Sequence, residues 1–171
     1  MTMRSLPLLL AMATASPVLA ADSAAKVHFL DYRSCLLHWE GYSLTPHRDY
    51  NGTIAVGIGH NLTAHKAVRK RRYTSEEVDR LFQRDLTTAL RAARAGVKDF
   101  DSLPHEARLV TISLIWQVGP TGFMRFKDYR TSISERNWSR AASELRDSLW
   151  YRQTPKARRN WAISTLKGLT R

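Results

Sequence analysis

Two carboxylates lie close together early in the chain, and both are residue types suited to acid or base chemistry. Glu40 ends an apolar segment, Asp49 follows nine residues later, and the glycine-rich run "GIGH" ends at His60. Cleavage of a glycosidic bond needs such a pair: a protonated acid that donates to the leaving oxygen, and a carboxylate that activates water or attacks the sugar carbon. One group must stay protonated while the other stays ionised. Spacing alone also allows the plainer interpretation that both are solvated surface residues.

A helix and a small hairpin are predicted to carry the two acids. Residues 26–40 place apolar side chains at helical spacing, and Gly41 is suited to end that helix, so Glu40 falls in its last turn. From 42 to 60, Pro and Gly residues interrupt short β-branched pieces, which is typical of a hairpin or meander. Asp49 would lie at the first turn of this hairpin.

The next elements are predicted to be helices. Thr74 and Glu77 form a capping box that opens a long helix over 74–96. Ser102 is suited to cap the following helix, which contains "ARLVTISLIWQVG" and is apolar on nearly every side. We therefore expect this second helix at the centre of the larger lobe.

Two further helices complete the predicted architecture. Asn137 is predicted to cap one, and Thr154 followed by Pro155 to begin the last. The pattern predicts an α+β, mainly α, two-lobed fold. A small hairpin-containing lobe of about 41–73 is joined by the long helix to a helical lobe of about 97–171, which also takes the first helix. A cleft between lobes is a common place for a ligand site.

The first twenty residues have the composition of an export signal. Arg4 supplies a positive start, residues 6–15 a short apolar run, and a small-residue cleavage site follows. A retained membrane anchor is the competing interpretation, but the run is short of the about 20 residues needed, and Pro17 interrupts it. We expect residues 1–20 to be cleaved, which leaves residues 21–171 periplasmic or secreted, without a stable membrane anchor.

The charge balance predicts a polyanionic partner. The chain has 27 Lys and Arg against 15 Asp and Glu, a net charge of +12. Nucleic acid, a membrane surface and an anionic wall polymer all fit this charge. The basic residues are spread over many segments without a recognition motif, so nucleic acid is not the expected partner. We expect a monomer.

Cysteine and histidine usage predicts neither a disulfide nor a metal. Cys35 is the single cysteine, so no internal disulfide can form, and its apolar segment favours a small buried hydrophobe over a nucleophile. The six His are scattered without metal-ligand spacing. We expect no metal and no cofactor.

Collinear blocks of the sequence resemble the phage-type lysozymes. The stretch from Glu40 through Asp49 to "GIGH" is similar to that family's catalytic stretch. "WQVGPTGFMRF" and "WSRAASELRDSLWYRQTPKARR" resemble its C-terminal lobe, and helix 74–96 fits its inter-lobe helix. The resemblance covers about residues 27–168, in the right order.

The resemblance implies a muramidase. Glu40 would be the general acid, and Asp49 the partner that positions water and stabilises positive charge on the sugar. The substrate would be the β-1,4 bond between N-acetylmuramic acid and N-acetylglucosamine in bacterial peptidoglycan, whose carboxylates suit a basic protein. His60 would hold the hairpin in place rather than act in the chemistry.

The same resemblance implies substrate-binding positions. Gln117 matches a position that contacts substrate across the cleft, and Asn61, Trp116 and Tyr129 fall where sugar or peptide contacts lie. Core packing is an equally good interpretation of Trp116.

Two positions depart from the family pattern. Where the family usually has a Thr that helps seat the attacking water, this chain has Ala55, whose methyl group cannot form a hydrogen bond. Where the family often has an Arg near the acid, this chain has Ala157. Arg158 or Arg159 could substitute, although a shift along a helix changes the face that a side chain occupies.

Other functions stay open on the sequence. A lysozyme fold that binds peptidoglycan without cutting it is one alternative, favoured by Ala55 and opposed by the retention of both acids. A muramidase that opens local gaps for an envelope machine is another, beside lysis by a phage enzyme. Inversion at the sugar carbon is the outcome that the resemblance implies.

Overall fold

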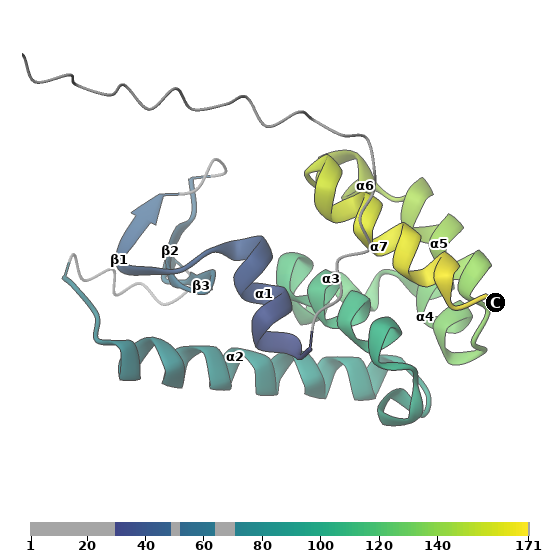
Figure 1. Ribbon diagram of the computed structural model, residues 1–171, viewed down its shortest axis with the longest axis horizontal. Helices are drawn as coiled ribbons and strands as arrows, with labels where there is room; N and C mark the ends of the chain where they lie inside the picture. The colour runs from purple at the N-terminus through teal and green to yellow at the C-terminus, as the bar shows by residue number, and fades with distance from the viewer. Residues whose placement is uncertain (1–29, 49–51, 64–70, 171) are drawn as a thin grey trace, which may run out of the picture.

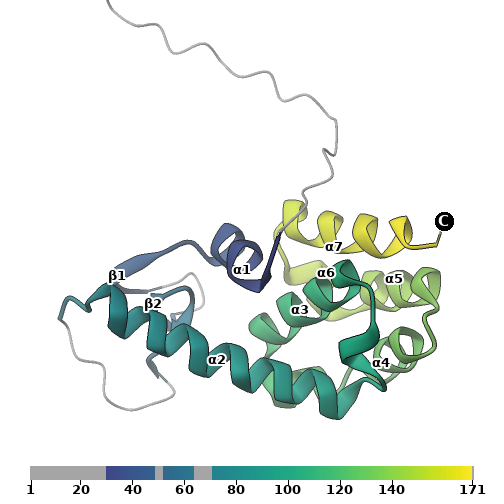
Figure 2. The same ribbon diagram turned by 60° about the horizontal axis from the view of Figure 1, so that its bottom comes forward.

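The predicted fold class, α+β and mainly α, is confirmed. The structure is a computed structural model that describes residues 30–48, 52–63 and 71–170. A small sheet lies over the first half of the long helix α2 (Ser75–Gly96), and the remaining helices gather around its second half (Figures 1 and 2). The predicted export signal lies outside the described residues. None of the helices in the described ranges has the length and apolar composition of a membrane span.

The first helix, α1 (Tyr32–Glu40), ends on the candidate acid as predicted. It begins at Tyr32, because the Asp31 side chain accepts from the Ser34 backbone N–H and the Ser34 hydroxyl accepts from the Asp31 backbone N–H. This reciprocal capping fixes the first turn. Residues 26–29 of the predicted helix lie outside the described residues. Gly41 ends the helix in a positive-φ conformation. Glu40 is thus held at the point where the helix meets the sheet.

Within the described residues, three antiparallel strands form the predicted hairpin region in the order β1-β2-β3. They are β1 (Ser43–Arg48), β2 (Ile54–Gly57) and β3 (His60–Asn61). Ala55 at the centre of β2 pairs with His47 on β1 and with Asn61 on β3. Asp49, expected at the turn after β1, lies outside the described residues.

Helix α2 begins and ends where the sequence predicts. The Thr74 and Glu77 side chains form the expected capping box, and Arg71 donates two further bonds to the Glu77 carboxylate, at 2.6 and 2.9 Å. The side chains that α2 buries lie at helical spacing along one face. They are Val78, Phe82, Ala89, Ala92 and Ala93.

The prediction that Ser102 caps the next helix is wrong. Ser102 closes a short 3-10 turn, Phe100–Ser102, in which its hydroxyl donates to the Asp99 carbonyl. Helix α3 (His105–Met124) begins three residues later, after Pro104. Because a proline before a helix fixes the entry of the chain without a side-chain cap, the serine is not needed there. Helix α3 buries nearly every side of its first half, as expected, and is kinked at Gly119.

The last helices pack as the second lobe (Figure 1). Asn137 caps the second of these four helices as predicted, by accepting from the Arg140 backbone. The final helix starts one residue later than expected, because Pro155 stands at the cap position and Thr154 is buried before it. The bounds are α4 (Lys127–Ser134), α5 (Trp138–Asp147), α6 (Leu149–Gln153) and α7 (Lys156–Gly168).

Candidate active site

Glu40 is held by an ion pair with a residue near the other end of the chain. Its Oε1 accepts from Nη1 of Arg158 at 2.6 Å, a contact between residues 118 positions apart. The Glu40 side chain is 22% exposed and the Arg158 side chain 4%. A charge-assisted bond this short fixes the direction of the carboxyl group.

Arg158 is itself anchored by the central helix. Its Nε donates to the hydroxyl of Ser113 at 3.1 Å, and its Nη2 donates to the Ser113 carbonyl at 3.0 Å. The guanidinium therefore bridges α7, α3 and the end of α1. Because all of its donors form a rigid planar fork, the position of Glu40 is tied to the backbone of the core helix.

The structure shows which of the two candidate arginines, Arg158 or Arg159, approaches Glu40. Arg158 faces inward, whereas Ala157 is exposed. Arg159 points elsewhere: its Nη1 donates to the Tyr151 carbonyl at 2.9 Å, and its guanidinium lies over the Tyr151 ring. The shift of one position moves the arginine to the face that meets Glu40.

The second carboxyl oxygen of Glu40 faces the turn between β2 and β3. A Cβ added at Gly59 would lie 3.2 Å from Oε2 of Glu40 and 3.2 Å from Nε1 of Trp116. Trp116, on α3, donates from that nitrogen to the Ile58 carbonyl. The φ of Gly59 is +72°, which a side chain rarely adopts. Glycine is thus required at position 59 both by the backbone and by the closeness of the acid.

Replacing Gly59 with Ala should therefore reduce activity by more than the accompanying loss of stability accounts for. Left-handed backbone costs about 1–2 kcal/mol for a residue with a Cβ, and the methyl group would also displace the Glu40 carboxyl or the Trp116 ring. Gly52→Ala is a matched control, because its φ is +83° but the added Cβ would meet only the end of the Arg48 side chain, at 3.6 Å. Rates of peptidoglycan digestion and thermal melting would be compared. Equal losses of activity in the two variants would contradict the steric role of position 59.

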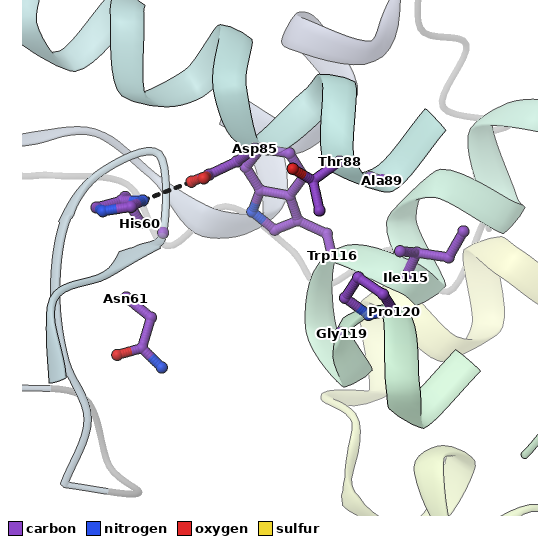
Figure 3. A pocket seen from close by; sticks show the side chains of 10 residues that line it. His60, Asn61, Asp85, Thr88, Ala89, Ile115, Trp116, Gly119 and Pro120 are labelled. Atoms are coloured by element: carbon purple, nitrogen blue, oxygen red, sulfur yellow. Dashed lines mark hydrogen bonds and ion pairs between the residues drawn. The ribbon is translucent and has the colours of Figure 1, made fainter. Parts of the chain in front are cut away.

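A cavity of about 200 Å³ opens beside this turn, between the sheet, α2 and α3 (Figure 3). Asn61 stands on the sheet side, and Trp116, Gly119 and Pro120 close the α3 side. The full lining comprises Gly59, His60, Asn61, Asp85, Thr88, Ala89, Ile115, Trp116, Gly119 and Pro120. Because Gly59 belongs to the lining and approaches Glu40, the cavity adjoins the candidate acid.

His60 has the positioning role expected of it. Its Nδ1 lies 2.6 Å from Oδ2 of Asp85 on α2, and its side chain is 6% exposed (Figure 3). The contact ties β3 to α2 at the floor of the cavity. A histidine bound in this way holds a strand in place.

The four predicted substrate-binding residues do not share one environment. Asn61 and Trp116 line the cavity, and Gln117 is exposed next to it, with Oε1 accepting from Nε1 of Trp150 at 2.7 Å. Tyr129 is different, because it is 1% exposed and its hydroxyl pairs with that of Thr111. This burial corrects the expectation for Tyr129, which is a core residue, and burial raises its pKa.

Trp116 combines the two interpretations that the sequence left open. It packs against Phe82 of the core, with ring centroids 5.6 Å apart, and also lines the cavity. Cys35 is buried as expected, and this burial raises the pKa of its thiol to about 12. A thiol with that pKa is not ionised at neutral pH and does not act as a nucleophile.

Sequence reasoning missed Ser113 and Trp150. Ser113 is 2% exposed in an otherwise apolar run, and a buried hydroxyl there signals a polar partner. Trp150 lies within the resembling block 138–159, but its bond to Gln117 joins α6 to α3 and depends on the fold. In the ranges that the structure describes, no group of three His, Cys, Asp or Glu is arranged to hold a metal ion.

The small sheet, the long helix and the helical lobe together make a lysozyme-like architecture. The family model described as "Phage lysozyme" matches residues 37–171, which include Glu40, the cavity and Arg158. The chain therefore belongs to the phage lysozyme family, and with it to the peptidoglycan hydrolases.

Several curated proteins are similar to this chain. "Probable T4-type lysozyme 1" of Dictyostelium discoideum is 27% identical over 158 residues, which cover 79% of this chain and 92% of that protein. "Pre-baseplate central spike protein Gp5" of Enterobacteria phage T4 is 27% identical over 67% of this chain, but over 24% of its own length. "Peptidoglycan hydrolase gp36" of Pseudomonas phage phiKMV is 28% identical over 76% of this chain and 14% of its own length.

Proposed function

We propose that the protein is a muramidase that cleaves the β-1,4 bond between N-acetylmuramic acid and N-acetylglucosamine, with Glu40 as general acid and Asp49 as base and electrostatic partner. The observation that carries this proposal is the fixed carboxyl group of Glu40, which is bonded to Arg158 through one oxygen and faces the turn beside the cavity with the other.

The ion pair decides which oxygen of Glu40 delivers the proton. A guanidinium has only hydrogen-bond donors, so Oε1 of Glu40 must act as the acceptor toward Arg158. Oε1 therefore does not hold the proton of the carboxylic acid. The transferable proton therefore belongs on Oε2, the oxygen near Gly59. Arg158 acts as a positioning residue in this scheme, because it orients the acid without touching the sugar.

The reaction follows from these roles. Glu40 gives its proton to the oxygen that leaves with the next sugar, and the bond between that oxygen and the anomeric carbon breaks. A water oxygen bonds to the same carbon from the opposite side, and Asp49 takes the proton that the water loses. This displacement inverts the anomeric carbon, which analysis of the product anomer tests.

The charge of the chain and the cavity residues fit the proposed substrate. Muramyl and peptide carboxylates of peptidoglycan would be attracted to a protein of net charge +12. We assign sugar or peptide contacts to Asn61, Trp116 and Gln117. We further propose that residues 1–20 direct export and that the protein acts as a monomer in the periplasm or outside the cell.

A wall-binding module without activity is the second candidate, and Ala55 is the observation that favours it. Purified peptidoglycan incubated with the native protein distinguishes the two. New reducing ends on released fragments, lost in Glu40→Gln and in Asp49→Asn, support the muramidase. Tight binding without release, equal in all three proteins, supports the binding module.

Restoring a hydroxyl at position 55 should raise turnover. A hydrogen bond to the attacking water contributes about 0.5–1.5 kcal/mol, so Ala55→Thr should increase kcat by about 2- to 10-fold. Ala55→Val is the matched control, since it has the shape of Thr without the hydroxyl. Ala55 is 7% exposed, so both variants share any cost of crowding. An equal kcat in the Thr and Val variants would contradict the water-seating account.

A further inference from the structure

We propose that Asn61 holds the attacking water in place of the missing hydroxyl at position 55. The inference rests on the proposed muramidase function and concerns how that reaction obtains its nucleophile in this chain. Ala55 provides no hydrogen bond, yet a water that attacks the sugar carbon must be held in line with the bond that breaks. Asp49 takes the proton of this water in the proposed scheme, and a second polar side chain on the same surface would fix the position of the water.

The sheet register identifies two neighbours that could do so. Residues directly opposite each other in antiparallel strands project their side chains to the same face, with Cβ atoms about 4.5–5.5 Å apart. Ala55 is paired with His47 on one side and with Asn61 on the other. Val56 and His60 form the adjacent pair, and His60 is bound to α2. Both His47 and Asn61 thus flank Ala55 on the face turned away from that contact.

The lining of the cavity beside the acid favours Asn61. Gly59 lies against Oε2 of Glu40, and Asn61 follows two residues later. Both residues belong to the lining of the cavity that adjoins Glu40. In inverting enzymes the two carboxyl groups are about 6.5–9.5 Å apart, which leaves room for the attacking water beside the sugar. His47 lies two strand spacings from Asn61, about 10 Å across the sheet, and is not among the residues that line this cavity.

The environment of Asn61 is also suitable. Its side chain is exposed and lines the cavity opposite Trp116, Gly119 and Pro120 (Figure 3). A primary amide has two N–H donors and a carbonyl oxygen, so it can hold a water and keep another partner at the same time. The water oxygen then bonds to the anomeric carbon as the glycosidic bond breaks, with Glu40 and Asp49 giving and taking the protons as above.

The inference changes what Asn61 is expected to do. A sugar contact made equally before and during the reaction would affect KM, whereas a residue that positions the attacking water acts in the transition state and affects kcat. Asn61→Leu keeps the size of the side chain and removes its hydrogen bonds. We expect kcat on soluble, uncross-linked peptidoglycan chains to fall at least tenfold, with KM within about twofold of the native value.

Two further variants make the test specific. Ala55→Thr, introduced into Asn61→Leu, should restore kcat at least fivefold, and Ala55→Val in the same background should not. His47→Leu alters the other flank of Ala55 and should leave kcat within about twofold. Thermal melting of each variant establishes that it is folded, and rescue by a single hydroxyl would not occur if Asn61 were merely structural.

The possible outcomes test the role of Asn61 separately from the proposed muramidase function. A native protein without activity would overturn both. An active native protein that loses activity in Glu40→Gln, but keeps its kcat in Asn61→Leu, overturns the role of Asn61 alone. A raised KM with unchanged kcat makes Asn61 a sugar contact, and a loss in His47→Leu instead places the water on the β1 side.

Discussion

Replacing Glu40 with Gln should reduce the release of reducing ends from peptidoglycan by about 10²- to 10⁴-fold, the range that a general acid contributes. Gln preserves the size of the side chain and an oxygen that can accept from Arg158, but it has no proton of comparable acidity to donate. The fold should survive, because the bond at Oε1 changes from a charged to a neutral acceptor.

The matched control for this variant is Glu135→Gln, which neutralises an exposed carboxylate at the end of α4. Both variants change the net charge by the same amount, so any general effect on attraction to the wall is shared. Activity of Glu40→Gln equal to that of Glu135→Gln would remove Glu40 from the mechanism.

Replacing Arg158 with Met should impair both activity and stability. Removing one member of a buried ion pair costs up to about 3–5 kcal/mol, because the remaining charge loses its partner. Glu40 is 22% exposed, so solvent should reduce that cost. Displacement of the carboxyl group by about 1 Å is enough for a loss of about 100-fold in kcat. Circular dichroism melts and the reducing-end assay measure the two effects.

A double variant distinguishes positioning from general damage. In Arg158→Met the Glu40 carboxylate loses its partner, and its unpaired charge should destabilise the fold. The double variant Arg158→Met with Glu40→Gln lacks this charge and should therefore be more stable than Arg158→Met alone. Arg159→Met is the matched control, because its contacts are with Tyr151. It should keep near-native activity, and a loss equal to that of Arg158→Met would contradict the assigned role.

Local signals in the sequence predicted most of the elements. Capping residues and glycines act within a few positions, so Thr74 with Glu77, Asn137 and Gly41 correctly marked helix ends. The same logic failed at Ser102, because a hydroxyl before a helix can bond to its own turn as readily as to the helix. Here the Ser102 hydroxyl donates to the Asp99 carbonyl of its own turn, and Pro104 occupies the cap position before α3.

The candidate site was predicted less completely, since its geometry depends on contacts between distant segments. Glu40 could be named from its position at a helix end and from family resemblance. Arg158 could be named only together with Arg159, because the phase of α7 relative to α1 is set by tertiary packing. For Tyr129 the family resemblance suggested a substrate contact, and this prediction was wrong because packing buries the side chain.

The bond between Glu40 and Arg158 also links the beginning of the folded domain to its final helix. The loop that this contact closes spans 118 positions, so its two ends meet more readily once the intervening elements have shortened the chain between them. A nascent chain that has formed α1 and the sheet, but not α7, therefore holds an unoriented acid. In the proposed mechanism, full activity therefore depends on the docking of the last helix, although that helix contributes no group that touches the sugar.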